Sequence, residues 1–203
     1  MLTDQGGAIA GLVLAAGSSA RMGSNKLLFT ISGETLVRRA ARHALAALDP
    51  VIVVLGYEAE AMGAELAGLR CRAIVNPEHA QGFHTSVRAG LAALPAGVEA
   101  AVVMLADMPL VTPAMLAQLV ERHRQTGAAL VVSQYGDAFA PPHLYTRRLF
   151  GELAQSEESR KQVIGRHRSE AVVLSWPAAA LADLDVPGDR ERIEALLAGG
   201  EGR

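Results

Sequence analysis

A loop rich in small residues carries two cationic side chains. Residues 14–26 read Leu-Ala-Ala-Gly-Ser-Ser-Ala-Arg-Met-Gly-Ser-Asn-Lys, so Arg21 and Lys26 lie in one segment. Small residues let backbone N–H groups approach an anion closely, and Gly17 can adopt a positive φ. The segment fits neither the Gly-Lys-Ser/Thr end of a P-loop nor a Gly-x-Gly-x-x-Gly fingerprint. Its chemistry indicates a polyphosphate site, and the alternative is a solvated turn with two exposed cations.

Lys26 is also a rare residue type in this chain. Of the 19 basic residues only Lys26 and Lys161 are lysines, and the others are arginines. The compact ammonium of a lysine contacts phosphate oxygens as a point charge. Its position in this loop therefore favours the polyphosphate interpretation.

Two aspartates are candidate metal ligands. Asp107 follows the apolar run 102–106, and Asp185 follows a shorter one. A carboxylate at the end of a buried strand needs a cation or hydrogen-bond donors, because its uncompensated burial is unfavourable. Magnesium held by one or two carboxylates and substrate phosphates would meet that need. The alternative for each aspartate is a turn or cap before a proline, Pro109 or Pro187.

Short runs rich in Val and Ile alternate along the chain with longer segments of helical spacing. The predicted strands are 9–15, 51–55, 72–75, 101–105, 130–133 and 171–174. Their lack of polar alternation is typical of parallel strands covered on both faces. Strands that alternate with helices predict an α/β fold with right-handed crossovers. The ligand crevice of such a fold lies beyond the carboxyl ends of the strands, so Lys26 and Asp107 should face each other across one triphosphate-sized gap.

The alternation of strands and helices ends near residue 135. Residues 135–143 contain a Gly-Asp and a Pro-Pro pair, which predict a loop or a short edge hairpin. Two polar helices are predicted over 146–153 and 158–167, and a closing helix over 189–197. The chain is therefore expected to be one domain, 9–198, preceded by an N-terminal extension, 1–8.

Composition limits the class of protein. The chain has 203 residues and a mass of 21.3 kDa, and 50% of its residues are hydrophobic, which suits a single domain with a full core. A net charge of -2 and a pI of about 6.3 argue against a general nucleic-acid or membrane-surface binder. One cysteine, Cys71, excludes an internal disulfide and a thiolate zinc site, and it favours a reducing, cytoplasmic location. No apolar run reaches the roughly 18 residues that span a bilayer, and residues 1–7 lack the basic start of a signal peptide.

Histidines and arginines outside this loop receive plainer interpretations. His79, His84 and His143 lie in predicted loops near the crevice and are candidate acceptor contacts. His43 lies on a helical stripe and is expected to pack or to face solvent. The arginine group at 38–42 is expected to be a solvated helix face.

Four segments, in order along the chain, resemble one family. Leu14-Ala15-Ala16-Gly17-x-Ser19-x-Arg21-Met22-Gly23-x-x-Lys26 resembles the signature of nucleotidyltransferases with a glycosyltransferase-A-like fold. Residues 76–89, 106–109 and 184–189 are similar to further motifs of the MobA-like NTP transferase family, and most similar to its molybdenum cofactor cytidylyltransferases (MocA-like). The resemblance covers residues from about 9 to 197. It implies a single-domain three-layer sandwich with a mostly parallel sheet.

This resemblance also implies a reaction. A nucleoside monophosphate would pass from an NTP to a phosphate acceptor, and pyrophosphate would be released with Mg2+ as cofactor. The Ala15-Ala16-Gly17 form resembles the cytidylyl enzymes, which favours CTP over GTP. The acceptor would be the phosphate of molybdopterin, with a molybdoenzyme as client and neither nucleic acid nor membrane as partner. A sugar- or polyol-phosphate acceptor, or a non-catalytic carrier of molybdenum cofactor, remain alternatives.

Roles for individual residues follow from the same resemblance. The catalytic residues would be Lys26, Arg21 and Asp107, and the metal ligands Asp107 and Asp185. The nucleotide would contact Leu14, Ala15, Ala16, Gly17, Ser18, Ser19, Arg21, Lys26, Asn76, Gly82 and Ser86. Ser86 lies near a predicted helix start, so it could instead only cap that helix. The nucleotide-binding half would be about 9–110 and the acceptor-binding half about 111–198.

Three segments depart from the family pattern. Ala106 replaces a glycine, a small change that leaves Asp107 in place. Where the family has Gly-His-Pro, this chain has Ala140-Pro141-Pro142 followed by His143, and residues 156–161 differ from the family's Gly-Asp-x-Gly-x-Arg. The last two departures lie in the acceptor half. The resemblance therefore implies the nucleotide chemistry more strongly than the acceptor.

Overall fold

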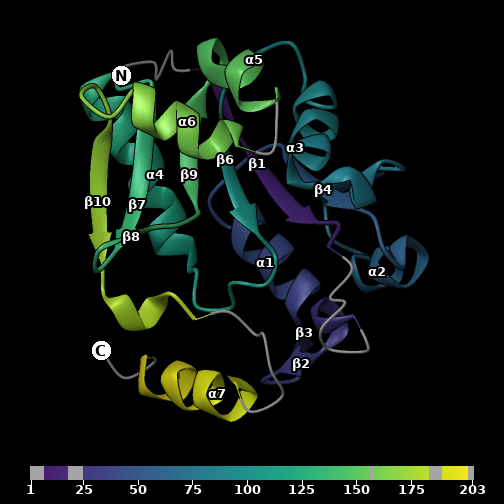
Figure 1. The fold of residues 1–203 in the computed structure, drawn as a ribbon. Helices are drawn as coiled ribbons and strands as arrows, with labels where there is room; N and C mark the ends of the chain where they lie inside the picture. The colour runs from purple at the N-terminus through teal and green to yellow at the C-terminus, as the bar shows by residue number, and fades with distance from the viewer. Residues whose placement is uncertain (1–6, 18–24, 156–157, 183–188, 201–203) are drawn as a thin grey trace, which may run out of the picture.

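The computed structural model describes residues 7–17, 25–155, 158–182 and 189–200, and Figure 1 shows how they fold. One sheet crosses the molecule in the order β10-β7-β9-β6-β1-β4-β5, with β8 paired to β7. Its strands are β1 (Ala8–Ala15), β4 (Val51–Leu55), β5 (Arg72–Val75), β6 (Val98–Leu105), β7 (Leu130–Tyr135), β8 (Ala138–Phe139), β9 (His143–Thr146) and β10 (Val172–Trp176). A small second sheet consists of β2 (Thr30–Ile31) and β3 (Glu34–Thr35).

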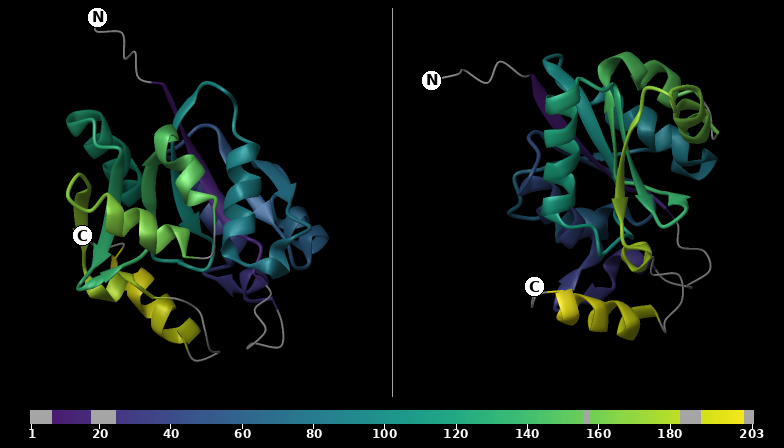
Figure 2. Two further views of the ribbon diagram at one scale, coloured as in Figure 1. Left: turned by 45° about the horizontal axis from the view of Figure 1, so that its top comes forward. Right: turned by 90° about the vertical axis from the view of Figure 1, so that its left-hand side faces the viewer.

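Helices cover both faces of the large sheet (Figure 2). The α-helices are α1 (Leu36–Leu45), α2 (Ala59–Glu65), α3 (Phe83–Ala92), α4 (Pro113–Thr126), α5 (Phe150–Leu153), α6 (Ser159–Arg166) and α7 (Asp189–Gly200). The 3-10 helices are η1 (Lys26–Leu28), η2 (His79–Gln81), η3 (Arg147–Leu149) and η4 (Ala178–Ala180). None of the helices in the described parts of the chain is long and apolar enough to cross a membrane.

The core lies in two layers, one on each face of the sheet. Along β1, Val13 and Ala15 belong to the layer that α1 and α4 complete, whereas Leu12 and Leu14 belong to the layer that α3 completes. All four side chains are buried. Because successive side chains of a strand point to opposite faces, a strand buried on both faces is apolar at every position. This is why the predicted strand runs lack alternation, and the predicted α/β fold class is confirmed.

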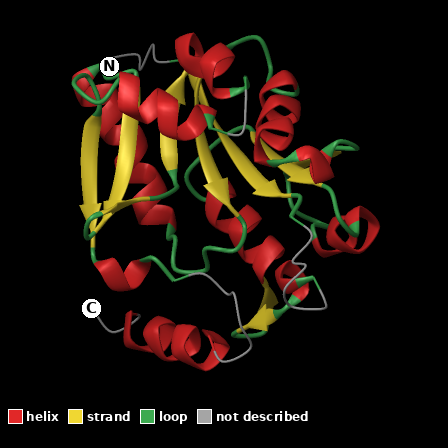
Figure 3. Cartoon of the chain, in the orientation of Figure 1, coloured by secondary structure: helices red, strands yellow, loops and turns green. Residues whose placement is uncertain are grey.

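The parallel strands end level with one another. Ala15 of β1 lies opposite Leu55 of β4, and Leu55 lies opposite Val75 of β5. On the other side of β1, Leu14 lies opposite Leu105 of β6. In Figure 3 the arrowheads of β1 and β6 point to the same edge of the sheet, and α7 lies beyond that edge. Residues that directly follow these strands are therefore neighbours in space.

The structure corrects the prediction for residues 135–143. A hairpin of β7 and β8 is present, but His143 already belongs to β9, which lies inside the sheet between β6 and β7 and is antiparallel to both. Its four residues follow two prolines and have no run of Val or Ile. Pairing with residues 100–103 of β6 makes this segment a strand. Tertiary pairing of this kind leaves no periodicity in the local sequence.

The predicted helix over 146–153 begins later than expected. Thr146 pairs with Ala100 as the last residue of β9, so helical structure starts with η3 at Arg147 and continues in α5. The predicted helices over 158–167 and 189–197 correspond to α6 and α7.

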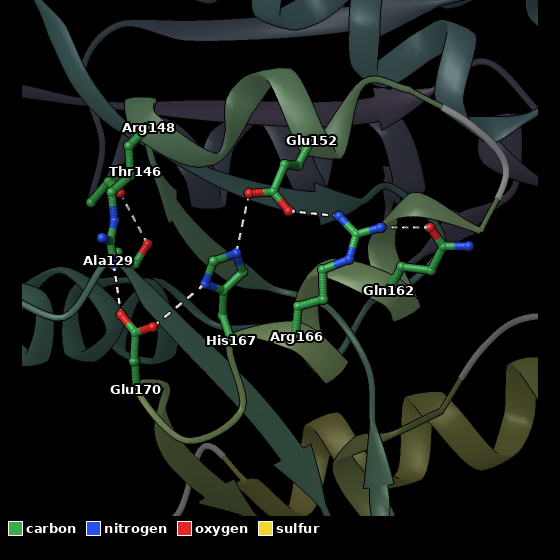
Figure 4. A network of polar contacts seen from close by, with 8 residues as sticks. All are labelled: Ala129, Thr146, Arg148, Glu152, Gln162, Arg166, His167 and Glu170. Atoms are coloured by element: carbon green, nitrogen blue, oxygen red, sulfur yellow. Dashed lines mark hydrogen bonds and ion pairs between the residues drawn. The ribbon is translucent and has the colours of Figure 1, made fainter.

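Polar side chains connect α5, α6 and the segment that leads to β10 (Figure 4). Glu152 of α5 forms an ion pair with Arg166 at 2.9 Å and lies 3.2 Å from Nε2 of His167. Glu170 forms an ion pair with Arg148 of η3 at 3.0 Å. The hydrogen bond with His167, followed by the ion pair with Arg166, lowers the pKa of the Glu152 carboxyl. This network fixes the short helices of the C-terminal half against one another.

Candidate active site

The ends of the strands are joined by backbone hydrogen bonds where the candidate residues begin. The N–H of Ala106 donates to the carbonyl oxygen of Leu14 at 3.1 Å, and the N–H of Asn76 donates to that of Leu55 at 2.8 Å. The loops after β1, β5 and β6 thus begin at one edge of the sheet. This edge is the place where open α/β sheets bind ligands.

Lys26 and Asp107 form an ion pair at this edge. Nζ of Lys26 lies 2.7 Å from Oδ2 of Asp107, and the two side chains are 15% and 23% exposed. The structure therefore brings together the two charged residues that the sequence placed on one side of the sheet. It differs from the expectation in one respect, because the two charges are in direct contact and no triphosphate-sized gap separates them.

Neighbouring residues fix the backbone of Lys26. Asn25 is buried, and its Oδ1 accepts a hydrogen bond from the N–H of Leu27 at 3.1 Å, which caps η1. Nδ2 of Asn25 donates to the carbonyl oxygen of Tyr57 at 3.4 Å. Leu27 is buried in the core. Lys26 therefore stands between two anchored residues, and its long side chain is the part that can move.

Helix α1 fixes the backbone that follows Asp107. Nε of Arg39 donates to the carbonyl oxygen of Pro109 at 3.1 Å, and Nδ1 of His43 lies 2.7 Å from the carbonyl oxygen of Val111. Burial lowers the pKa of His43, and the nearby Arg39 contributes in the same direction. A neutral imidazole with its proton on Nδ1 donates this hydrogen bond. Arg39 and His43 therefore position the turn that carries the candidate carboxylate.

Sequence reasoning missed these two positioning residues. The group at 38–42 was expected to be solvated, but Arg38 donates to the carbonyl oxygen of Glu65 at 2.6 Å and Arg42 pairs with Glu34 at 2.9 Å. Arg39, in the same group, binds a backbone carbonyl of the site segment. Every residue has a carbonyl, so the sequence carries no signal for such a partner.

Asn76, after β5, is the centre of a buried hydrogen-bond network. Its Nδ2 donates to Oγ1 of Thr85 at 2.8 Å and to Oγ of Ser86 at 3.0 Å, and its Oδ1 accepts from the N–H of Glu78 at 3.0 Å. Thr85 donates in turn to the carbonyl oxygen of Gly82 at 2.8 Å. Asn76 and Ser86 are both buried, so their polar groups hold the start of α3 at the sheet edge.

The first residues of the candidate phosphate loop differ in their exposure. Leu14, Ala15 and Ala16 are buried, and the carbonyl oxygens of Leu14 and Ala16 accept hydrogen bonds from the N–H groups of Ala106 and Tyr57. Gly17 is exposed, with open space around the position of a Cβ. The predicted site residues Ser18, Ser19, Arg21 and Asp185 lie outside the described residues.

Gly56, directly after β4, allows the loops to pack closely. A Cβ at this position would lie 2.7 Å from the carbonyl oxygen of Ala16 and 2.7 Å from Cβ and Cγ of His79. Any other residue would push the ends of β1 and β4 apart. His79 is half-buried against this glycine, at the edge where the sequence placed it.

His143 is not at a loop surface. It is buried in β9, and its Nδ1 accepts a hydrogen bond from the N–H of Ser133 at 3.1 Å. Nearby, Ser133 donates through Oγ to the carbonyl oxygen of Pro142 at 2.6 Å, and Tyr135 donates to that of Pro141 at 3.0 Å. The prediction that His143 lies in a loop is therefore wrong, and its burial removes the reason for which it was a candidate acceptor contact.

One carboxylate of the described site is suited to a divalent metal. Within the described ranges there is no group of three His, Cys, Asp or Glu side chains placed to share an ion. Asp107 offers a partly exposed hard oxygen ligand that already holds a cation, the ammonium of Lys26. Such a donor set fits a metal ion that takes its other ligands from substrate phosphates and water.

Fold and site together define an α/β domain with a paired cation and carboxylate at the carboxyl edge of its sheet, where such sheets bind ligands. Residues 11–172 match the family described as MobA-like NTP transferase domain, and the chain belongs to this family. The predicted family is confirmed. Both Lys26 and Asp107 lie within the matched residues.

The curated relatives are longer than this chain. It is 38% identical over 136 residues to the bifunctional protein GlmU of Micrococcus luteus, an alignment that covers 60% of this chain and 26% of GlmU. The GlmU of Geobacter metallireducens is 30% identical over 188 residues, which cover 87% of this chain and 39% of GlmU. The chain therefore spans less than half the length of these relatives.

Solved structures match the whole fold. Rv0371c of Mycobacterium tuberculosis superposes with a TM-score of 0.81 at 29% identity, covering 93% of this chain and 98% of Rv0371c. Rv0371c has also been crystallised in complex with manganese, and that structure superposes with a TM-score of 0.77 at 27% identity, covering 93% and 98% of the two chains. Molybdopterin-guanine dinucleotide biosynthesis protein A of Archaeoglobus fulgidus shares the fold, with a TM-score of 0.66 at 19% identity over 94% of this chain and 99% of its own.

Proposed function

We propose that the chain transfers CMP from CTP to the phosphate of molybdopterin and releases pyrophosphate. The reaction would use a divalent metal ion, with Mg2+ as the expected ion. The observation that carries the proposal is the ion pair Lys26–Asp107 at the carboxyl edge of the sheet, the edge at which β1 leads into Gly17. A cation for phosphate and a carboxylate for metal are the two groups that nucleotidyl transfer needs. A molybdoenzyme client would receive the product.

The reaction is an in-line displacement. An oxygen of the acceptor phosphate forms a bond to the α-phosphorus of the NTP, and the bond from that phosphorus to the α–β bridging oxygen breaks. Pyrophosphate leaves with the bonding electron pair. The acceptor is already an anion, so no general base is required, and catalysis consists of positioning and charge neutralisation.

Residues of the nucleotide-binding half, 9–110, divide this work. Lys26 neutralises the departing phosphates, and the backbone N–H groups at Ala16 and Gly17 orient them. Asp107 would hold the metal ion, which would supply positive charge that offsets the repulsion between the two anions. The sequence motifs assign Arg21, Ser18 and Ser19 to the triphosphate as well, and Asp185 to the metal.

The nucleoside would lie against the segment that Asn76 organises. The amide of Asn76 binds Thr85, Ser86 and the N–H of Glu78, so we assign Asn76 and Ser86 the role of holding this segment, the nucleoside wall, in place. Gly82 has φ of 117°, and its backbone leads into the first turn of α3. Backbone groups near Gly82 would then read the base and ribose. The acceptor half, 111–198, would supply the surface that binds the acceptor phosphate.

A pyrophosphate-release assay tests the proposal. The protein is incubated with CTP, GTP, UTP or ATP, with Mg2+ or Mn2+, and with molybdopterin, a sugar phosphate, a polyol phosphate or no acceptor. Release with CTP only when molybdopterin is present supports the proposed reaction. Release with a sugar or polyol phosphate instead would identify that compound, and not molybdopterin, as the acceptor. No release with any acceptor, together with binding of molybdopterin, would favour a non-catalytic carrier.

Asp107→Asn is the test variant for this assay, and Arg70→Met is its control. Asp107→Asn keeps the shape of the side chain and removes its charge, so it should lower metal-dependent release by about two to three orders of magnitude. Arg70 is exposed just before β5, at the edge of the sheet opposite the carboxyl ends of the strands, so Arg70→Met should retain wild-type release. Equal turnover of wild type and Asp107→Asn would refute the role of Asp107.

A further inference from the structure

The two charged groups of the site bind each other. Nζ of Lys26 contacts Oδ2 of Asp107 at 2.7 Å, and both side chains are mostly removed from water. In the proposed reaction, however, Lys26 must hold phosphate and Asp107 must hold a divalent cation. In this structure each residue is therefore engaged by the other.

One carboxylate in this position cannot serve both cations at full strength. A metal ion of this kind lies about 2.0–2.6 Å from its oxygen ligands. The ammonium of Lys26 already lies against one oxygen of Asp107, so a metal on this carboxylate would be within a few ångströms of it. Two cations at such a distance repel each other strongly in a partly buried site. Lys26 must leave Asp107 before a divalent cation can bind well.

The surroundings confine this exchange to side chains. Asn25 and Leu27 anchor the backbone on both sides of Lys26, and Arg39 and His43 hold the segment after Asp107. The lysine stem has four carbons and its ammonium has no fixed donor geometry, so it can turn from carboxylate to phosphate without a backbone change.

We propose that the Lys26–Asp107 ion pair is a latch that couples metal binding to triphosphate binding, an inference that rests on the proposed function. A triphosphate gives the ammonium of Lys26 a new partner and so frees Asp107 for the metal ion. By linkage the reverse also holds, and metal on Asp107 frees Lys26 for the triphosphate. Metal alone then binds weakly, and the site fills when both arrive.

Direct measurement of metal binding tests the latch. Mn2+ is titrated into nucleotide-free protein, and free Mn2+ is followed by electron paramagnetic resonance. Lys26→Met keeps the length of the stem and removes its charge, so it should bind Mn2+ about tenfold more tightly than the wild type, within the usual range of coupling between sites. Lys161→Met should bind as the wild type does. The double variant Lys26→Met/Asp107→Asn should lose the gain.

Two results overturn the latch. One is Mn2+ affinity of Lys26→Met equal to or below that of the wild type, provided that circular dichroism shows the variant folded. The other is a gain that survives in the double variant, because the metal would then bind elsewhere. If Lys26→Met does not fold, Lys26→Gln is measured in its place with the same criteria.

Failure of the latch and failure of the proposed function have different signatures. The Mn2+ titration contains no nucleotide and no acceptor, so it does not depend on the reaction. Wild-type turnover with CTP and molybdopterin, combined with no gain in Lys26→Met, leaves the function and removes the latch. A gain in Lys26→Met, combined with no turnover for any acceptor, leaves the latch and removes the function.

Discussion

Nδ1 of His43 in α1 lies 2.7 Å from the carbonyl oxygen of Val111, in the turn that begins with Asp107. Val111 is buried, so this imidazole is the donor that satisfies a carbonyl with little access to water. The same helix contacts η1, where the N–H of Leu36 donates to the carbonyl oxygen of Phe29 at 3.1 Å. One helix therefore sets the distance between the segment of Lys26 and the segment of Asp107.

His43→Leu should lower both turnover and stability. The carbonyl of Val111 would be left buried without its donor, which costs about 1–3 kcal/mol of unfolding free energy. The turn would shift, and kcat should fall about tenfold, because a displacement on the order of 1 Å can cost up to a hundredfold in rate. KM for the nucleotide should stay near the wild-type value, because His43 does not line the phosphate loop. Urea unfolding and steady-state pyrophosphate release measure the two effects.

His43→Asn is the matched control for that variant. Its amide offers an N–H donor near the position of Nδ1, so it should restore most of kcat and part of the stability. A purely structural role would give a different result: both variants would lose stability while kcat of the folded protein stayed at the wild-type value.

The stability of the fold should depend on pH through His43. Burial lowers the pKa of this imidazole below its ordinary value of 6.5. Below about pH 6.5 the unfolded chain takes up a proton that the folded chain does not, so the unfolding free energy falls as the pH decreases toward the lowered pKa. Above about pH 6.5 both states are neutral and this contribution is constant. Urea unfolding at about pH 7.5 and pH 5.5 should show a smaller loss for His43→Asn than for the wild type. An equal loss in both proteins would contradict the assignment.

Lys26 and Asp107 should act as one unit in catalysis. Lys26→Met should lower kcat/KM by about two to three orders of magnitude, the usual loss for one strong charge-stabilising donor. Asp107→Asn should lower it by a similar factor, because each variant leaves the other charge without its role in the same transition state. The double variant should be little worse than either single variant, since residues that act as a unit are not additive. Full additivity of the two losses would contradict a shared site, and Arg70→Met serves as the control for a lost exposed cation.

The central sheet could be predicted from the sequence because its strands are buried on both faces. β1 and β4 are covered on both faces, so their continuous apolar runs identify them without knowledge of their neighbours. The short strand β9 is different, because pairing with β6 makes it a strand and its own residues do not. The late start of α5 follows from the same pairing, since Thr146 belongs to the strand.

The part of the candidate site that lies at the strand ends could be predicted from the sequence. Lys26 and Asp107 follow β1 and β6, and parallel neighbouring strands end at the same edge, so their meeting could be predicted. Arg39 and His43 could not be placed, because their partners are backbone carbonyls 70 and 68 residues away. A histidine near two prolines suggested a loop at residue 143, but the side chain is a buried acceptor for the N–H of Ser133.

Asn76→Ala should raise KM for the nucleotide more than it lowers kcat. The change removes three hydrogen bonds, to Thr85, Ser86 and the N–H of Glu78, and leaves that buried segment without its organiser. Loosening of the predicted nucleoside wall should raise KM about tenfold, the lower part of the range for a misplaced binding group. Stability should fall by about 1–3 kcal/mol, because buried partners lose their bonds. Steady-state kinetics with varied CTP and urea unfolding measure both quantities.

Ser86→Ala tests whether the hydroxyl of Ser86 contacts the nucleotide or only helps to position the nucleoside wall. Asn76 binds both Ser86 and Thr85, so removal of the Ser86 hydroxyl leaves Asn76 with two of its three hydrogen bonds. If Ser86 only holds the start of α3, KM for the nucleotide should therefore change less than threefold. Thr85→Val keeps the shape of the side chain but removes a hydroxyl that donates to Gly82 and Glu78, so it should reproduce most of the effect of Asn76→Ala. If Ser86→Ala instead raises KM as much as Asn76→Ala does, with unchanged stability, the hydroxyl of Ser86 contacts the nucleotide directly and its purely positioning role is refuted.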